Sequence, residues 1–336
     1  MTTWVPGWIK LGTMLATVAC ITLAEAQPAP KPSSASGDAY PTRAIRMIVA
    51  FPPGGPTDIV SRIIAKRLSE QLGQPIIIDN KPGAGGNIGA ETAARAAPDG
   101  YTLFYNTSAI TIAPAVYARV NFDPVKDFAP VSTTAAVPMV VMVNPALPVK
   151  TIGELVAYVK ANPGRLNYGS TGTGTITHLA SAAFAASAGL DIQHVPYKGS
   201  APNIADLAAG TTQMTTDTLN SSIAFIKDGR VRPLAVTTKR RTPIAPELPT
   251  LDETVLPGME MSAWQGIVAP AGTPSAIVVR LNEEIGRALS HPEVVRQLAA
   301  QGTDILGSTP KAYSDMIRSE LARWVEVARS SKARVQ

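Results

Sequence analysis

Residues 44–58 read AIRMIVAFPPGGPTD and join an apolar, β-branched run to a turn of proline and glycine. The Thr57-Asp58 pair opens a pattern in which apolar side chains recur every four positions between residues 60 and 72. Gly73 follows as a typical helix stop. This segment therefore predicts a strand, a tight glycine turn and a helix, which together form the repeating unit of an α/β fold.

The same alternation continues along the chain on both sides of a restart near residue 150. Further strands are predicted at 75–79, 101–106, 137–143, 166–169 and 265–269. Helices are predicted at 88–96, 151–161, 175–188, 274–289, 292–300 and 309–329. The segments 192–197, 203–209, 213–217 and 234–237 continue the alternation. The order predicts two α/β units, each a mainly parallel sheet flanked by helices, and then a helical return.

A helical tail that packs back on the first unit would make that unit discontinuous. The predicted domains are then 41–140 plus 266–336 for the first lobe and 141–265 for the second. The strands at 137–143 and 265–269 become the two hinges.

The N-terminal sequence predicts an export signal. The apolar run 11–23 is shorter than the roughly 20 residues that a membrane-spanning helix needs, and Ala24-Glu25-Ala26 follows it as a cleavage motif. We expect a signal peptide over 1–26, cleaved near Ala26, then a flexible leader over 27–40, and hence a periplasmic protein. The alternatives are an uncleaved anchor and lipidation of Cys20, which the continuing apolar run disfavours.

The charge balance excludes one class of partner. The 336 residues include 30 Lys and Arg against 25 Asp and Glu, and 45% are hydrophobic, which is enough for a sizeable core. A nucleic-acid-binding protein would cluster its basic residues. Here they are dispersed, and the densest run, Lys239-Arg240-Arg241, is typical of a solvated surface. We therefore expect no nucleic-acid partner.

Two glycine loops are the candidate ligand site. Residues 51–58 and 169–175 each follow a predicted strand and open a predicted helix. Glycine lets the backbone turn sharply, and a helix N-terminus offers unpaired N–H groups and a partial positive charge. A single loop of this kind can equally be a tight turn with a capping threonine. Two of them, one in each half, predict an anion held from both sides of a cleft.

Motifs for catalysis and cofactors do not occur. The sequence lacks GxxxxGK[ST], G-x-S-x-G and HExxH, and its histidines are too scattered for a local metal motif. We expect no cofactor, no metal and no catalytic residue. Asp58 is expected to favour its helix N-terminus. Asp217, at a strand end, is a candidate partner for a ligand amine or hydroxyl.

Six segments carry a family resemblance: FPPGGPTD, KPGAGGNIGA, PDGYTLFYN, YGSTGTGTITHL, VPYKG and WQGIVAPAGTP. Together they resemble the Bug-type (TctC-like) solute-binding proteins of tripartite tricarboxylate transporters, from Tyr40 to the end of the chain. The resemblance implies a two-lobed periplasmic-binding-protein (Venus flytrap, type II) fold. It also implies carboxylate binding by the two glycine loops, through backbone N–H groups and ordered water, and membrane transporter subunits as partners.

The resemblance also assigns ligand-binding positions to the two loops and to nearby strand ends. They are Pro53, Gly54, Gly55, Thr57, Asp58, Asn106, Thr107, Ser170, Thr171, Gly172, Thr173, Thr175, His178, Tyr197 and Asp217. Pro56 departs from the family's frequent small residue there and has no N–H to offer. The leading hypothesis is a monomeric receptor that captures a small carboxylate for uptake. The alternatives are a periplasmic enzyme acting on a carboxylate and a ligand-sensing accessory of a membrane kinase.

Overall fold

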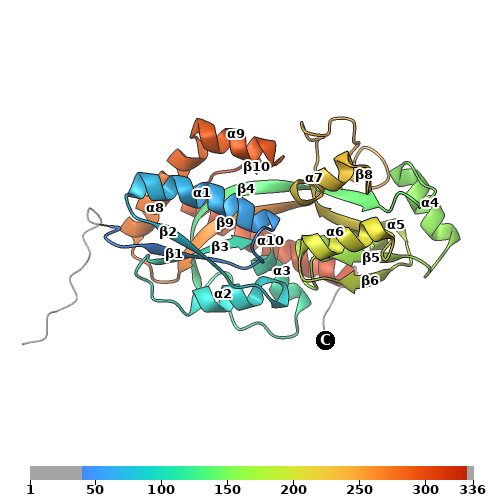
Figure 1. Cartoon of the computed structure of the whole chain (residues 1–336). Coiled ribbons are helices and arrows are strands. Elements are labelled where there is room, and N and C mark those ends of the chain that lie inside the picture. Colours follow the sequence, from blue (N-terminus) through green and yellow to red (C-terminus); the bar gives the residue numbers. More distant parts are fainter. Residues whose placement is uncertain (1–39, 331–336) are drawn as a thin grey trace, which may run out of the picture. The chain divides into compact units, whose positions relative to one another are not determined.

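The computed structural model describes residues 40–330 (Figure 1). The expected signal peptide, Cys20 and all but the last residue of the expected leader lie outside this range. Tyr40, that last residue, is buried, and its hydroxyl donates a hydrogen bond to the carbonyl of Gly100 at 2.6 Å. The packed part of the described chain therefore includes Tyr40.

The first of two sheets is mixed in direction. Its strands within residues 40–330 are β1 (Ile45–Val49), β2 (Ile76–Asn80), β3 (Thr102–Thr107), β4 (Phe128–Val143), β9 (Ser262–Pro270) and β10 (Asp304–Ile305). Strands β2, β1 and β3 pair in parallel, β9 lies antiparallel to β3 and to β4, and β10 pairs with β4. We call this sheet and its helices the first lobe.

Helices cover both faces of the first sheet, as the strong apolar character of its strands requires. They are α1 (Pro56–Leu72), α2 (Asn87–Ala94), α3 (Ala109–Val116), α8 (Ser275–Leu289), α9 (Pro292–Ala300) and α10 (Pro310–Ser330). Met47 and Val49 of β1 pack with residues of α1, α8 and α9, whereas Ile48 packs with residues of α2, α3 and α10. Figure 1 shows α1 and α8 on the opposite side of the sheet from α2.

The second sheet uses the far end of β4 together with β5 (Asn167–Ser170), β6 (Gln193–Pro196), β7 (Met214–Thr218) and β8 (Arg232–Val236). Strand β5 is parallel to β6 and β7, and β4 is antiparallel to β7 and β8. Its helices are α4 (Ile152–Ala161), α5 (Ile176–Ala188), α6 (Ser200–Ala209) and α7 (Leu219–Lys227). Side chains of α4 and α5 fill one core and those of α6 and α7 another. We call this the second lobe.

Strand β4 links the two lobes. Up to Pro138 it pairs with β9, and from Met139 it pairs with β7 and β8. Helix α10 also reaches both lobes, because Tyr313 packs in the first and Trp324 in the second. The partner switch lies close to residue 140, where the sequence predicts a boundary, and the domain limits stay a prediction.

Most predicted elements are confirmed within one to three residues. The predicted strand at 137–143 is the second half of β4, which has 16 residues. Helices α3 and α7 and strand β10 have no counterpart in the prediction. No helix between residues 40 and 330 combines the length and apolar character needed to cross a membrane.

Candidate functional site

A pocket of about 360 Å³ opens beyond the carboxyl ends of strands from both sheets. It is bounded by the β1–α1, β5–α5, β6–α6 and β7–α7 connections and by the ends of β3 and β9. This edge is where open α/β sheets bind ligands, because the connections there are free to shape a crevice.

Four helices of the described chain begin at the wall of this pocket. The wall includes Thr57 of α1, Ile176 of α5, Ser200 of α6 and Ser221 of α7, each in the first turn of its helix. The first N–H groups of a helix have no partner within it, and the helix dipole adds partial positive charge at that end. The pocket therefore favours an anion.

Asp58 stabilises the first glycine loop through hydrogen bonds to its carboxylate. Its carboxylate accepts hydrogen bonds from Gly54 N at 2.8 Å, Arg62 Nε at 2.8 Å and Asn80 Nδ2 at 2.9 Å, and its side chain is buried. Burial alone would raise the pKa of Asp58, but the bonds from Arg62, Gly54 and Asn80 outweigh it and keep this pKa below its usual value. The carboxylate is thus charged and shapes the loop.

The second glycine loop is also stabilised internally. Thr175 caps α5 by accepting from His178 N and donates through its hydroxyl to Gly172 O at 2.6 Å. Thr171 N donates to Thr177 Oγ1 at 2.9 Å, and Gly172 N donates to Ser170 Oγ at 3.2 Å. These loop amides are engaged, so the first-turn N–H groups of the helices are the main backbone donors left for a ligand.

The structure brings eight of the predicted site residues to the pocket wall. They are Pro53, Gly54, Gly55, Thr57, Thr107, Thr171, Thr175 and Asp217. The other seven do not line it: Asp58, Asn106, Ser170, Gly172, Thr173, His178 and Tyr197. For the eight residues at the wall, contact with a ligand stays a prediction. The seven that do not line the pocket would affect binding only by positioning residues that do.

Strand alternation separates two neighbouring candidates. Thr107 lies at the pocket, whereas Asn106 points to the opposite face, where its Oδ1 accepts a bond from the Tyr313 hydroxyl of α10 at 2.5 Å. Tyr197 also faces away, since its hydroxyl donates to Asp206 Oδ2 at 2.7 Å.

Asp217 borders the pocket without exposed surface in it. Its carboxylate accepts from Ser200 Oγ at 2.9 Å, Asn203 Nδ2 at 2.8 Å, Thr218 N at 2.7 Å and Ser221 Oγ at 3.3 Å. Burial raises the pKa of Asp217, although the hydrogen bonds oppose the shift. These contacts tie the start of α6 to the start of α7, so Asp217 fixes this part of the wall.

His178 and His194 stack behind the second glycine loop. Their ring centroids are 4.0 Å apart, His194 Nε2 lies 2.6 Å from Ser170 Oγ, and His178 Nδ1 accepts from Gly174 N at 3.3 Å. Burial lowers the pKa of His178 to about 4; burial, with the charge of His178, lowers that of His194 to about 3. Both rings are therefore neutral near pH 7.

Acidification is expected to destabilise the protein through these two rings. Histidine in an unfolded chain has a pKa of about 6.5. The two neutral rings therefore make their full contribution to the free energy of unfolding above that pH, and the contribution is lost as the pH drops toward the folded pKa values of about 4 and 3. Urea unfolding at about pH 7 and about pH 5 measures this fall before most carboxylates titrate. His178→Gln should reduce the difference in midpoint between the two pH values; an equal difference in wild type and variant would contradict the assignment.

Sequence reasoning missed several wall residues, among them Gln265, Lys198 and Phe225. Lys198 is the one cationic side chain that lines the pocket in the described range, and it is exposed. Gln265 lies opposite Thr107 in the β3–β9 register, so the strand pairing was the signal that could have identified it. Within residues 40–330, no group of three or more His, Cys, Asp or Glu side chains is arranged to hold a metal ion.

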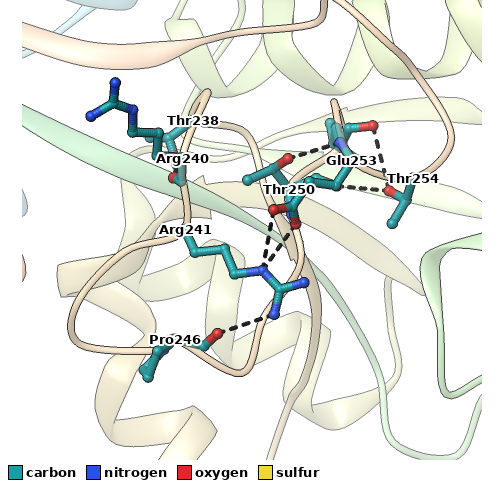
Figure 2. A network of polar contacts seen from close by, with 8 residues as sticks. Thr238, Arg240, Arg241, Pro246, Thr250, Glu253 and Thr254 are labelled. Carbon is teal, nitrogen blue, oxygen red and sulfur yellow. Dashed lines mark hydrogen bonds and ion pairs between the residues drawn. The ribbon is translucent and has the colours of Figure 1, made fainter.

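The basic run Lys239-Arg240-Arg241 does not line the pocket. All three side chains are exposed, which confirms the prediction of a solvated surface. Figure 2 shows Arg241 bound to Glu253, with Nε to Oε2 at 3.0 Å, and to the carbonyl of Pro246 at 3.3 Å. This network braces the connection between β8 and β9.

A family model and a sequence relative both match most of this chain. The model of the tripartite tricarboxylate transporter family receptor (TctC) matches residues 60–332. BugT of Bordetella pertussis is 36% identical over 303 residues, which cover 90% of this chain and 93% of BugT. The sequence therefore resembles this relative over nearly its whole length.

Two solved structures resemble the chain at the level of the whole fold. Rpa4515 of R. palustris, solved with adipate, has a TM-score of 0.84 and 39% identity and covers 87% of this chain and 98% of its own. MatC of Rhodopseudomonas palustris, with bound malate, has a TM-score of 0.81 and 32% identity, with 86% and 99% covered. The predicted two-lobed periplasmic-binding-protein fold is thereby confirmed. The chain belongs to the TctC family of tripartite tricarboxylate transporter receptors, which includes the Bug proteins.

Proposed function

We propose that this protein is a periplasmic receptor that captures a small carboxylate with an apolar body for a tripartite tricarboxylate transporter. The convergence of four described helix N-termini on one pocket carries this proposal, because it offers an anion several backbone donors without a cationic side chain in either glycine loop. The adipate and malate of the related structures support a carboxylate as the ligand.

The wall chemistry supports an apolar body in the ligand. Phe51, Ile59, Ile176 and Phe225 contribute apolar surface, and Lys198 is the one cation among the described wall residues. Each additional carboxylate taken out of water needs its own partners, and beyond the helix N-termini the described wall offers one cationic side chain, Lys198. An acid with one or two carboxylates on a carbon chain therefore suits the pocket better than a compact tricarboxylate.

Calorimetry with adipate, malate and citrate tests this proposal. We expect adipate to bind at least about tenfold more tightly than citrate, which corresponds to about 1.4 kcal/mol. Small-angle scattering should show a smaller radius of gyration at saturating adipate, because a ligand gripped by both lobes favours their closed arrangement. Binding of none of these acids, or a preference for citrate, would contradict the proposal.

An enzymatic function is the second candidate, because Ser170 Oγ and His194 Nε2 have the separation of a nucleophile and its base. Ser170 is fully buried and does not line the pocket, so a substrate in the pocket does not meet its hydroxyl. The geometry thus favours a receptor without turnover. Incubation of the bound acid with protein, followed by mass spectrometry, should return the acid unchanged.

Co-purification with a membrane kinase rather than transporter subunits would favour the sensing role.

A further inference from the structure

Gln265 is a polar side chain at the inner edge of the pocket. It belongs to β9, lines the pocket and is only 2% exposed. In the antiparallel register of β3 and β9 it lies directly opposite Thr107, which also lines the pocket. Residues paired in this way project from the same face of a sheet, so the two side chains form one polar strip in the first lobe.

The orientation of the Gln265 amide is fixed by a buried neighbour. The Tyr105 hydroxyl donates to Gln265 Oε1 at 2.9 Å and lies 2.9 Å from Thr134 Oγ1. Burial raises the pKa of Tyr105 well above its usual value, so this hydroxyl keeps its proton. With Oε1 held as the acceptor, Nε2 is turned away from Tyr105.

The Nε2 group itself is available. It has no hydrogen-bond partner among residues 40–330, and it is not one of the unpaired polar atoms that are sealed from solvent there. Because Gln265 is nearly buried and lines the pocket, the accessible part of its amide faces the pocket. A ligand that covered Nε2 without offering an acceptor would leave this donor unpaired, which costs free energy of binding. A ligand with an acceptor at this position is therefore favoured.

We propose that Gln265 contacts the ligand directly and determines specificity: its Nε2 donates a hydrogen bond to a carboxylate oxygen of the bound acid. This inference rests on the proposed function, since it names a residue that recognises the carboxylate. The start of α1 lines the same pocket from the same lobe, so a carboxylate there meets both the amide and the helix N-terminus. Tyr105 acts as a positioning residue for this amide.

The test uses adipate as the probe, with malate in its place if adipate gives no heat, and calorimetry on purified variants. Gln265→Met keeps the size of the side chain but removes the donor, and we expect about a tenfold loss of affinity. Gln265→Glu keeps the acceptor for Tyr105 and places a second carboxylate beside that of the ligand, so a loss of about a hundredfold is expected. Gln301→Glu, which makes the same charge change outside the pocket, should bind like the wild type. Thermal unfolding of each variant confirms that it is folded.

A double-mutant cycle tests the positioning role. Tyr105→Phe should weaken binding in the wild-type background but change little in the Gln265→Met background, because no amide is left to orient. A folded Gln265→Met protein with wild-type affinity would overturn this inference and leave the proposed function standing. A wild-type protein that binds neither acid would overturn the proposed function and this inference with it.

Discussion

Gly85→Ala is expected to weaken adipate binding by at least about thirtyfold while the protein stays folded. Gly85 lies in the KPGAGGN segment of the first lobe, within a short 3₁₀ turn (Ala84–Gly86). There the lobes touch: the Tyr117 hydroxyl, at the end of α3, donates to the carbonyl of Thr173 at 2.6 Å in the second glycine loop. A methyl group at Gly85 would lie 2.7 Å from Thr173 O and 2.8 Å from Tyr117 Oη. The variant would therefore prevent the close approach of the KPGAGGN segment to the second glycine loop that the structure shows.

The control separates this steric effect from backbone strain. Gly85 has a φ of +66° and Gly189, at the end of α5, has a φ of +65°, so alanine is similarly unfavourable at both. A methyl group at Gly189 meets no atom within 4 Å. Gly189→Ala should lower the melting temperature as much as Gly85→Ala and leave calorimetric affinity nearly unchanged. Equal affinities of the two variants would show that the contact between the loops does not govern binding.

Asp58→Ala is expected to lower the free energy of unfolding by about 3 kcal/mol, because it leaves a charged and two neutral donors without their buried acceptor. Those donors are Arg62, Gly54 N and Asn80. Affinity should fall as well, since Asp58 shapes the loop that forms one wall of the pocket. The depressed pKa of Asp58 means that this stabilisation is present above the usual carboxylate range and is lost as the pH falls through the lower folded value.

Urea unfolding at neutral pH measures this loss, and α10 offers the comparison. Lys311 and Asp315 form an ion pair with the same spacing of four residues, but both side chains are exposed, by 84% and 60%. Asp315→Ala should therefore change the free energy of unfolding by less than about 0.5 kcal/mol. A loss for Asp58→Ala that is no larger than this would contradict the role assigned to Asp58.

Local periodicity and stop residues predicted most of the secondary structure correctly. The failures have physical causes. The first half of β4, FAPVSTTA, mixes small and polar residues and is buried only because both its neighbours come from distant parts of the chain. Helix α3, AITIAPAV, is apolar on nearly all sides and contains Pro114, so it shows no amphipathic stripe. Tertiary contacts, rather than local pattern, determine both elements.

The candidate site was predictable as loops but not as side chains. Glycine, proline and threonine between a strand and a helix marked both loops, and both lie at the pocket. Which strand-end residues face it depends on alternation and register, which place Thr107 and Gln265 at the pocket and turn Asn106 toward α10. His178 lies in α5 and His194 in β6, so their spacing in the sequence did not predict that the two rings stack.

One shared strand also restricts how the lobes can move. Because β4 runs without a break from one sheet into the other, hydrogen bonds on both sides of Pro138 prevent the sheets from sliding past each other along it. Pro138 offers no N–H to either ladder, so the peptide units around it carry the least restraint. We therefore expect relative motion of the lobes to occur by bending and torsion near this point, although α10 and the connection from β8 to β9 also cross between the lobes. A joint of this kind would convert a small rotation near Pro138 into a larger displacement of the loops farther from the axis.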